Sequence, residues 1–153
     1  MVSTKGRYAL RVMIDLAQHA QEECISLRDI ANRQQISVKY LEAVIAILNR
    51  AGMVKSRMGK NGGYQLSKSP GEYFIGEILR VTEGAIVPVS CLEGAVNTCE
   101  RAAQCITLPM WTELGLLISD YLNHLTLEDL ICGNVRRRLP VSKGYSGNRE
   151  GTR

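Results

Sequence analysis

The hydrophobic pattern of the first half of the chain changes its period once, and this change limits the folds open to it. Apolar residues recur at helical spacing in segments 7–20 and 26–34, and in a stretch that follows Ser37 and ends at Gly52. Residues 54–66 instead alternate weakly and turn through the glycine-rich sequence GKNGG, which is typical of a β-hairpin. The pattern therefore predicts three helices and then a hairpin, which is the order of elements in a winged helix-turn-helix.

Apolar stripes and capping residues predict how the three helices are oriented. Ser26 with Asp29 resembles a capping box, and Ser37 is a favourable N-cap for the third helix. We expect the first helix to bury a stripe made of Ala9, Val12, Met13, Leu16, Ala17 and Ala20. The core stripe of the third helix is Leu41, Val44, Ile45 and Leu48. Its opposite side would expose Val38, Lys39, Glu42, Ala43 and Asn49.

The second half of the chain is again helical. Residues 74–84 have the spacing of a short helix, and residues 126–131 begin with a second cap pattern. Between them, segment 109–125 predicts a long helix that opens with a proline in its first turn. Residues 133–153 are too polar to pack and are expected to form a disordered basic tail. The seam of the long helix has alternating steps of three and four, at Trp111, Leu114, Ile118, Tyr121 and Leu125.

Charge is distributed unevenly along the chain. Residues 1–68 hold eleven Lys and Arg against five Asp and Glu, whereas residues 69–132 hold two against nine. A basic first half beside an acidic second half suggests that the first half meets a polyanion, although two ordinary solvated faces would look the same. Lys55, Arg57 and Lys60 fall on the predicted hairpin, next to the exposed side of the third helix. Together with the element order, this favours double-stranded DNA as a partner.

Cysteine is concentrated in one segment. Cys91, Cys99 and Cys105 lie within fifteen residues, and the total of five cysteines in a chain with no evident secretory or membrane-spanning segment argues for reduced thiols in the cytoplasm. No CxxC pair of the zinc-ribbon kind is present in this segment. Thiolates are the standard ligands of iron–sulfur clusters, but zinc, a redox disulfide, or thiols that simply pack as small apolar groups are the alternatives.

Several motifs occur in the order found in one known family. The segments STKGRYALRVMIDLA, LRDIANRQQIS, KYLE, SRMGKNGGYQL and IGEILRVTEG, followed by three cysteines and a Trp, resemble the IscR-type (Rrf2) family of bacterial transcription regulators. The resemblance runs from about Ser3 to Leu130. It implies a mostly α fold: a winged helix-turn-helix with a long C-terminal dimerisation helix, in a homodimer whose cysteine loop holds an iron–sulfur cluster in many members. The expected regions are a DNA-binding domain at 1–84, a cysteine cluster loop at 85–108, dimerisation helices at 109–132 and the tail at 133–153.

The resemblance also assigns candidate residues. Glu42 stands where the family often presents a glutamate to a base edge, and the cytosine amino group is the usual donor to such a carboxylate. In the wing, Met58 occupies the place where relatives often carry Arg, and Arg57 precedes it. The expected DNA contacts are Ser37, Val38, Lys39, Glu42, Arg57, Lys60 and Tyr64. The expected metal ligands are Cys91, Cys99 and Cys105.

A fourth cluster ligand is not evident. Leu108 stands where well-known relatives have a histidine, and Arg7 or Tyr8 falls where others supply a carboxylate from the partner subunit. Three thiolates fit a 4Fe–4S cluster with one labile iron better than a 2Fe–2S cluster, which remains the alternative. The candidates for an unmatched fourth ligand are Glu93, Glu100 and Asp15 of the partner subunit.

The leading hypothesis is a dimeric transcription regulator whose operator binding is controlled by an iron–sulfur cluster. One alternative is a cluster-free regulator of the same fold that senses through a thiol, zinc or a protein partner. The other, from a different class, is a small iron–sulfur electron-transfer protein. An enzyme is not expected, because the sequence has neither a phosphate-binding glycine loop nor a nucleophile–base pair.

Overall fold

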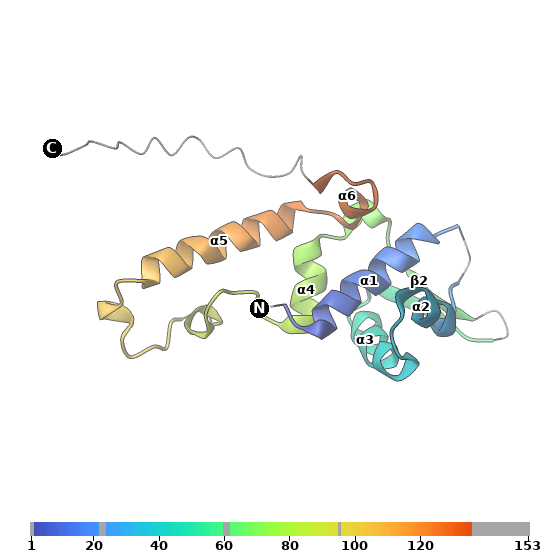
Figure 1. The fold of residues 1–153 in the computed structure, drawn as a ribbon, viewed down its shortest axis with the longest axis horizontal. Helices are drawn as coiled ribbons and strands as arrows, with labels where there is room; N and C mark the ends of the chain where they lie inside the picture. The colour runs from blue at the N-terminus through green and yellow to red at the C-terminus, as the bar shows by residue number, and fades with distance from the viewer. Residues whose placement is uncertain (1, 22–23, 60–61, 95, 136–153) are drawn as a thin grey trace.

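The computed structural model describes residues 2–21, 24–59, 62–94 and 96–135, so Lys60 and the predicted tail beyond residue 135 lie outside the described residues. Helices dominate, and the strands form one two-stranded antiparallel sheet, as the sequence predicts (Figure 1). The main elements are α1 (Thr4–Gln18), α2 (Leu27–Gln34), α3 (Val38–Arg50), β1 (Val54–Arg57), β2 (Gly63–Leu66), α4 (Ile75–Glu83), α5 (Leu108–His124) and α6 (Leu127–Ile131). Three short 3-10 turns, η1 (Pro70–Glu72), η2 (Ser90–Leu92) and η3 (Ala102–Gln104), lie in the connections.

Local capping signals fix most helix starts where the sequence predicts them. The Ser26 and Ser37 hydroxyls accept hydrogen bonds from the backbone N–H of Asp29 and of Tyr40. The first helix begins ahead of its apolar stripe, because Ser3 caps it and α1 starts at Thr4. A serine before a segment with no strong apolar pattern is easy to overlook, although its hydroxyl satisfies an N–H that would otherwise lack a partner.

The head, which comprises α1 to α4 with the β1–β2 hairpin, contains most of the hydrophobic core, and Leu125 and Leu127 from the α5–α6 end complete it. The predicted α3 stripe is confirmed, since all four of its residues are buried. On α1, Val12 and Met13 are fully buried, whereas Ala17 is half-buried. Ala20 is exposed and follows the end of the helix, so the expectation that the stripe continues to residue 20 is wrong. The helix ends at Gln18, two residues before Ala20.

The hairpin is joined to the helices of the head by the connection between α1 and α2. Tyr64 and Ile25 exchange two backbone hydrogen bonds of 2.8 and 2.9 Å, which adds a short bridge beside β2. Gly63 is required there, because a Cβ at that position would lie 2.3 Å from the carbonyl oxygen of Ile25. The bridge fixes the base of the hairpin relative to α1 and α2.

Helix α5 extends away from the head and is attached to it at one end (Figure 1). Ile75 donates its N–H to the carbonyl of Leu125 at 2.8 Å, and Leu127 donates to the carbonyl of Tyr73 at 2.9 Å. None of the residues of α5 is buried. Met110, Leu116 and Leu117 are each more than half exposed, so a large apolar surface of this helix faces solvent in the single chain.

Candidate nucleic-acid interface and cysteine loop

The exposed side of α3 carries the residues that the sequence assigns to DNA. Val38 is 39% exposed, and Lys39 and Glu42 are exposed on the side opposite the core stripe. Ser37 lies just before them, and its hydroxyl is engaged as the N-cap. The first turns of α3 therefore present a short aliphatic group, a cation and a carboxylate together, a mixture suited to reading base edges.

Tyr40 is a surface residue of α3 that sequence reasoning missed. It is 37% exposed, and its ring meets the ring of Tyr8 edge to face at a centroid distance of 5.3 Å. The Arg11 guanidinium lies 5.5 Å from the centre of the Tyr8 ring. This stack holds an aromatic ring beside the exposed turn of α3. The available signal was the position of Tyr40 between Lys39 and the buried Leu41.

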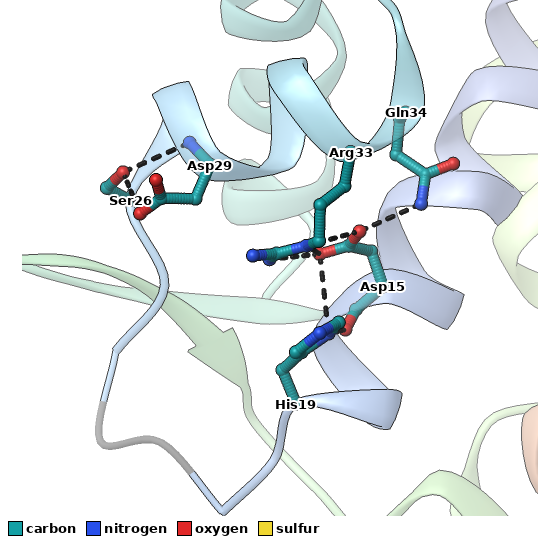
Figure 2. Close-up of polar contacts among 6 residues, drawn as sticks. All are labelled: Asp15, His19, Ser26, Asp29, Arg33 and Gln34. Carbon is teal, nitrogen blue, oxygen red and sulfur yellow. Dashed lines mark hydrogen bonds and ion pairs between the residues drawn. The ribbon is translucent and has the colours of Figure 1, made fainter.

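A buried carboxylate fixes α2 against α1 (Figure 2). Asp15 is 1% exposed and accepts a 2.6 Å hydrogen bond from Nη2 of Arg33 and one of 2.8 Å from Nε2 of Gln34. Burial raises the pKa of Asp15, but the hydrogen bonds and positive charge of its partners more than offset this, and its pKa is lowered. Arg11 donates to the Gln34 side-chain oxygen at 3.0 Å, which extends the network along α1.

This network places α3 as well as α2. Gln35 follows α2 directly in the left-handed conformation, with φ of 55°, and only Ile36 separates it from the α3 cap at Ser37. With so short a turn, an anchored α2 fixes where α3 begins. The hypothesis that Asp15 of a partner subunit ligates a cluster is not supported, because Asp15 is buried and occupied within its own head.

The hairpin presents a basic and an apolar residue together at its tip. Lys55 and Arg57 are exposed on β1, and Met58, the next residue, is 97% exposed. Tyr64, predicted to contact DNA, is half-buried and packs against the core. Its main evident task is to join β2 to the α1–α2 connection, and a DNA contact by its side chain stays a prediction.

The three predicted thiol ligands lie on the long connection between α4 and α5. Cys91 falls in η2 and is half-buried, Cys99 is exposed, and Cys105 directly follows η3 and is half-buried. Within the described ranges, no three His, Cys, Asp or Glu side chains come close enough together to hold a metal ion. In the single chain the three cysteines are therefore neighbours in sequence without forming one site.

The chemistry of the donor set nevertheless fits an iron–sulfur cluster. All three residues are free thiols, and thiolates are the ligands that such clusters require. The Sγ atom of Cys105 lies 3.4 Å from the Thr107 hydroxyl, and this contact and the N–H groups that begin α5 lower the pKa of Cys105. The thiol donors thus suit an iron–sulfur cluster. Binding of a cluster would require the connection to change shape and bring the three sulfur atoms together.

The start of this connection is attached to the first turn of α1. Glu83, the last residue of α4, accepts hydrogen bonds of 2.6 Å from the Ser3 hydroxyl and of 2.6 Å from the Gly6 N–H. A side chain at Gly6 would collide with this carboxylate, since a Cβ there would lie 2.4 Å from it. The cysteine-bearing connection thus leaves the head at a point tied to the same helix that holds Asp15.

Comparison with known proteins gives a consistent result. Residues 2–133 match the family profile described as "Rrf2: Iron-dependent Transcriptional regulator". The chain is 39% identical over 130 residues to the protein named rrf2 of Nitratidesulfovibrio vulgaris, covering 85% of this chain and 86% of the relative. It is 37% identical over 130 residues to the HTH-type transcriptional regulator IscR of Pectobacterium carotovorum, covering 85% and 78%.

A solved structure shares the architecture. The fold matches CymR, described as the global cysteine regulator of B. subtilis, with a TM-score of 0.72 and 38% sequence identity. The match covers 87% of this chain and 97% of that one. Among the described residues, no helix has the length and apolarity needed to cross a membrane.

Proposed function

The chain belongs to the Rrf2 family of DNA-binding transcription regulators, and from this premise we propose that α3 and the β1–β2 hairpin form its operator-binding surface. The protein is a regulator and not an enzyme. The exposed residues Val38, Lys39 and Glu42 support the proposal for α3, with Glu42 accepting a hydrogen bond from a cytosine amino group in the major groove. Lys55 and Arg57 on the hairpin would contact phosphates. A protein with this task acts in the cytoplasm, where promoter DNA is found.

We also propose that the regulator works as a homodimer through α5. The support is the apolar surface that this helix leaves open, including Leu114 at 39% and Leu117 at 59% exposure. A second copy of the same helix would cover such a surface in a symmetric interface. Two heads would then be placed to meet two half-sites of one operator.

Control of operator binding is assigned to Cys91, Cys99 and Cys105, which we propose hold an iron–sulfur cluster. The single observation that carries this proposal is that three free thiols share the one connection between the head and α5. Three protein ligands suit a 4Fe–4S cluster, in which one iron would lack a protein ligand. Leu108, at the place of a fourth ligand in the resembling family, cannot supply a donor atom.

The two ends of the connection link the position of the thiols to the placement of the DNA-binding head. The connection begins beside Glu83, which is hydrogen-bonded to Ser3 and Gly6 of the α1 end, and it finishes at the first turn of α5. Drawing the three sulfurs together would shorten this connection and change the placement of α5 relative to α1. A bound group that favours one placement over the other shifts the population of DNA-binding heads.

The test is to purify the protein without oxygen and measure iron, sulfide and the Mössbauer spectrum together with affinity for operator DNA. We expect a 4Fe–4S signal whose one iron site is lost first under stepwise chelation, and a change in affinity when the metal is removed. A variant with all three cysteines changed to serine should lose the signal and the metal-dependent change. A stable 2Fe–2S signal would contradict the labile-iron proposal, and zinc in place of iron in protein from an iron-replete native host would contradict the cluster.

A cluster-free thiol sensor is the second candidate. The specific observation in its favour is the lowered pKa of Cys105, which increases the thiolate fraction available for oxidation or exchange. CymR, which shares the fold, is described as a global cysteine regulator. If Cys105→Ser alone removed all redox dependence of DNA binding in protein that contains no iron, this second function would replace the first.

A further inference from the structure

The joint between the head and α5 contains a directional side-chain contact. Nη2 of Arg80 on α4 donates a hydrogen bond of 2.7 Å to Oδ1 of Asn123, the penultimate residue of α5. The two backbone hydrogen bonds that attach this end of α5 lie beyond its last residue, and the half-buried Tyr121 and Leu122 make only apolar contacts with the core. The Arg80–Asn123 hydrogen bond joins the two helices themselves, so its geometry constrains the angle between them.

Gly76 makes room for this contact. It lies one turn before Arg80 on the same face of α4, and it is buried. A Cβ at residue 76 would lie 2.6 Å from Oδ1 of Asn123 and 3.1 Å from Nη1 of Arg80. The amide and the guanidinium therefore both lie close against the backbone of residue 76, and a side chain there would displace Asn123 from Arg80.

The turns of α5 that precede this contact have space beside them. None of the residues of α5 is buried, and the helix extends away from the head (Figure 1). A cavity of about 280 Å³ lies beside the helix, lined among others by Arg80, by Ile86 and Leu92 of the connection, and by Gly115 and Ser119 of α5. The contact at Asn123 therefore lies at the pivot of an arm that has room to tilt.

A small change of angle at this pivot becomes a large displacement. The part of α5 from its first residue to Asn123 extends over about 22 Å, so a tilt of about 10° shifts its far end relative to the head by about 4 Å. In a symmetric dimer built on α5, both heads are displaced. Consecutive base pairs of a duplex are only about 3.4 Å apart, so the angle at the pivot decides which base pairs the two heads reach.

We propose that Arg80 and Asn123 are positioning residues that set the separation of the two half-sites in the operator, and that Gly76 permits their contact. This inference deepens the proposed function, since it rests on the dimer through α5 and on the binding of DNA by α3. The separation of half-sites depends on the distance and orientation between two heads, which contacts within one half-site cannot determine. In this role the two residues act without touching DNA.

The experiment uses the full-length protein and an operator with two half-sites, which the protein selects from a random-sequence library. Duplexes are then made with one or two base pairs added to the centre or removed from it. Dissociation constants are measured for the wild type and for Asn123→Leu and Gly76→Ala, which break the contact in two different ways. Asn123→Asp keeps an acceptor for Arg80. Ser119→Ala is the matched control, because it removes the 3.2 Å hydrogen bond from Nδ2 of Asn123 to the Ser119 hydroxyl but leaves Arg80 in place.

We expect the wild type to bind the preferred spacing at least about tenfold more tightly than a spacing changed by one base pair, because two rigidly placed heads match one separation. Asn123→Leu and Gly76→Ala should reduce this ratio to about threefold, and should weaken binding to the preferred spacing by only about two- to threefold through the loss of preorganisation. Asn123→Asp and Ser119→Ala should keep the ratio within about twofold of the wild type, since both retain an acceptor for the guanidinium. Discrimination at the base pair read by Glu42 should be the same in all variants.

The inference is overturned if Asn123→Leu and Gly76→Ala lose affinity equally at every spacing, because the contact would then serve only the stability of the fold. It is also overturned if the wild-type dimer tolerates every spacing, or if Asn123→Asp behaves like Asn123→Leu. Failure of the proposed function has a different signature. A wild type that sediments as a monomer, or that binds no duplex, would contradict the dimer or the DNA surface, whereas a dimer that binds its operator with the same spacing ratio in all variants removes only the role of Arg80 and Asn123.

Discussion

Helices α1 and α5 have similar lengths but opposite surroundings. The fifteen residues of α1 include six that are buried, among them the charged Asp15, whereas none of the seventeen residues of α5 is buried. The core of the head, to which Leu125 and Leu127 also contribute, is therefore closed within one chain, whereas the surface of α5 is not. An apolar surface of this extent is typical of a helix that binds another protein surface. The contrast divides the molecule into a head with a closed core and a helical arm whose apolar surface is open to solvent, the surface that we propose a second copy covers.

The largest expected effect comes from placing charge on the arm. Leu114→Asp with Ile118→Asp would bury unpaired carboxylates in the proposed interface, and we expect dimers to dissociate to monomers at micromolar concentration. Sedimentation velocity measures the change. The head should keep its melting temperature, because neither residue belongs to its core. Glu113→Gln with Asp120→Asn is the matched control, since it also changes two charges on α5 but leaves the apolar residues in place. A double Asp variant that sediments as a dimer would show that α5 is not the interface.

A substitution inside the head should instead lower the stability of the head. Asp15→Asn removes the charge that holds Arg33 and Gln34, and should lower the free energy of unfolding of the head by about 3 kcal/mol. This is the low end for a buried pair, because the Arg33 side chain is 32% exposed. Chemical denaturation measures the loss. The exposed Asp29→Asn at the start of α2 is the control and should cost less than about 1 kcal/mol. Equal losses for the two variants would mean that the network does not secure α2.

The pH dependence of stability provides a second test of the Asp15 network. The pKa of Asp15 is lowered in the folded head, so its contribution to stability is present above the unfolded carboxyl pKa, about 3.9, and is lost as the pH falls through the lower folded value. The stability difference between the wild type and Asp15→Asn should therefore be constant near neutral pH and narrow below about pH 4. A difference that instead widened in acid would contradict a lowered pKa.

On the DNA surface, Glu42→Ala should relax discrimination at one base pair by about 1–3 kcal/mol, because its carboxylate accepts from one cytosine. The measurement is affinity for the operator and for a set of single-base variants. The neighbouring exposed Ala43, changed to Ser, is a mild control on the same turn. A uniform loss across all duplexes for Glu42→Ala would remove its base-reading role and leave α3 as a positioning element.

The smallest effect is expected from one phosphate contact. Arg57→Ala should weaken binding to every duplex to a similar extent and reduce the slope of log affinity against log salt by about one per subunit. Anisotropy titrations at several salt concentrations measure it. Arg57→Lys keeps the charge and should retain most of the slope. If Arg57→Ala changed sequence preference without changing the slope, the hairpin would read bases and not the backbone.

The sequence by itself determined the local parts of this protein. Caps at Ser26 and Ser37, the α3 stripe and the glycine turn of the hairpin were all predicted, because each depends on residues three or four apart or on one turn. The grouping of three cysteines was also visible in the sequence. These signals were sufficient for the winged helix-turn-helix and for the resemblance to a regulator family, which the matches confirm.

Only the tertiary structure decided how distant residues combine. Asp15 and Arg33 are eighteen positions apart, and no local pattern indicates that α1 and α2 meet there through a buried ion pair. The same applies to Glu83, which accepts hydrogen bonds from Ser3 and Gly6 although they are 80 and 77 positions away in the sequence. Among the described residues of the single chain, the three thiols are close in sequence without forming a group that could hold a metal, so their role as cluster ligands stays a prediction. Periodicity and capping report the few residues of one turn, whereas these contacts depend on the packing of whole helices, which the core as a whole determines.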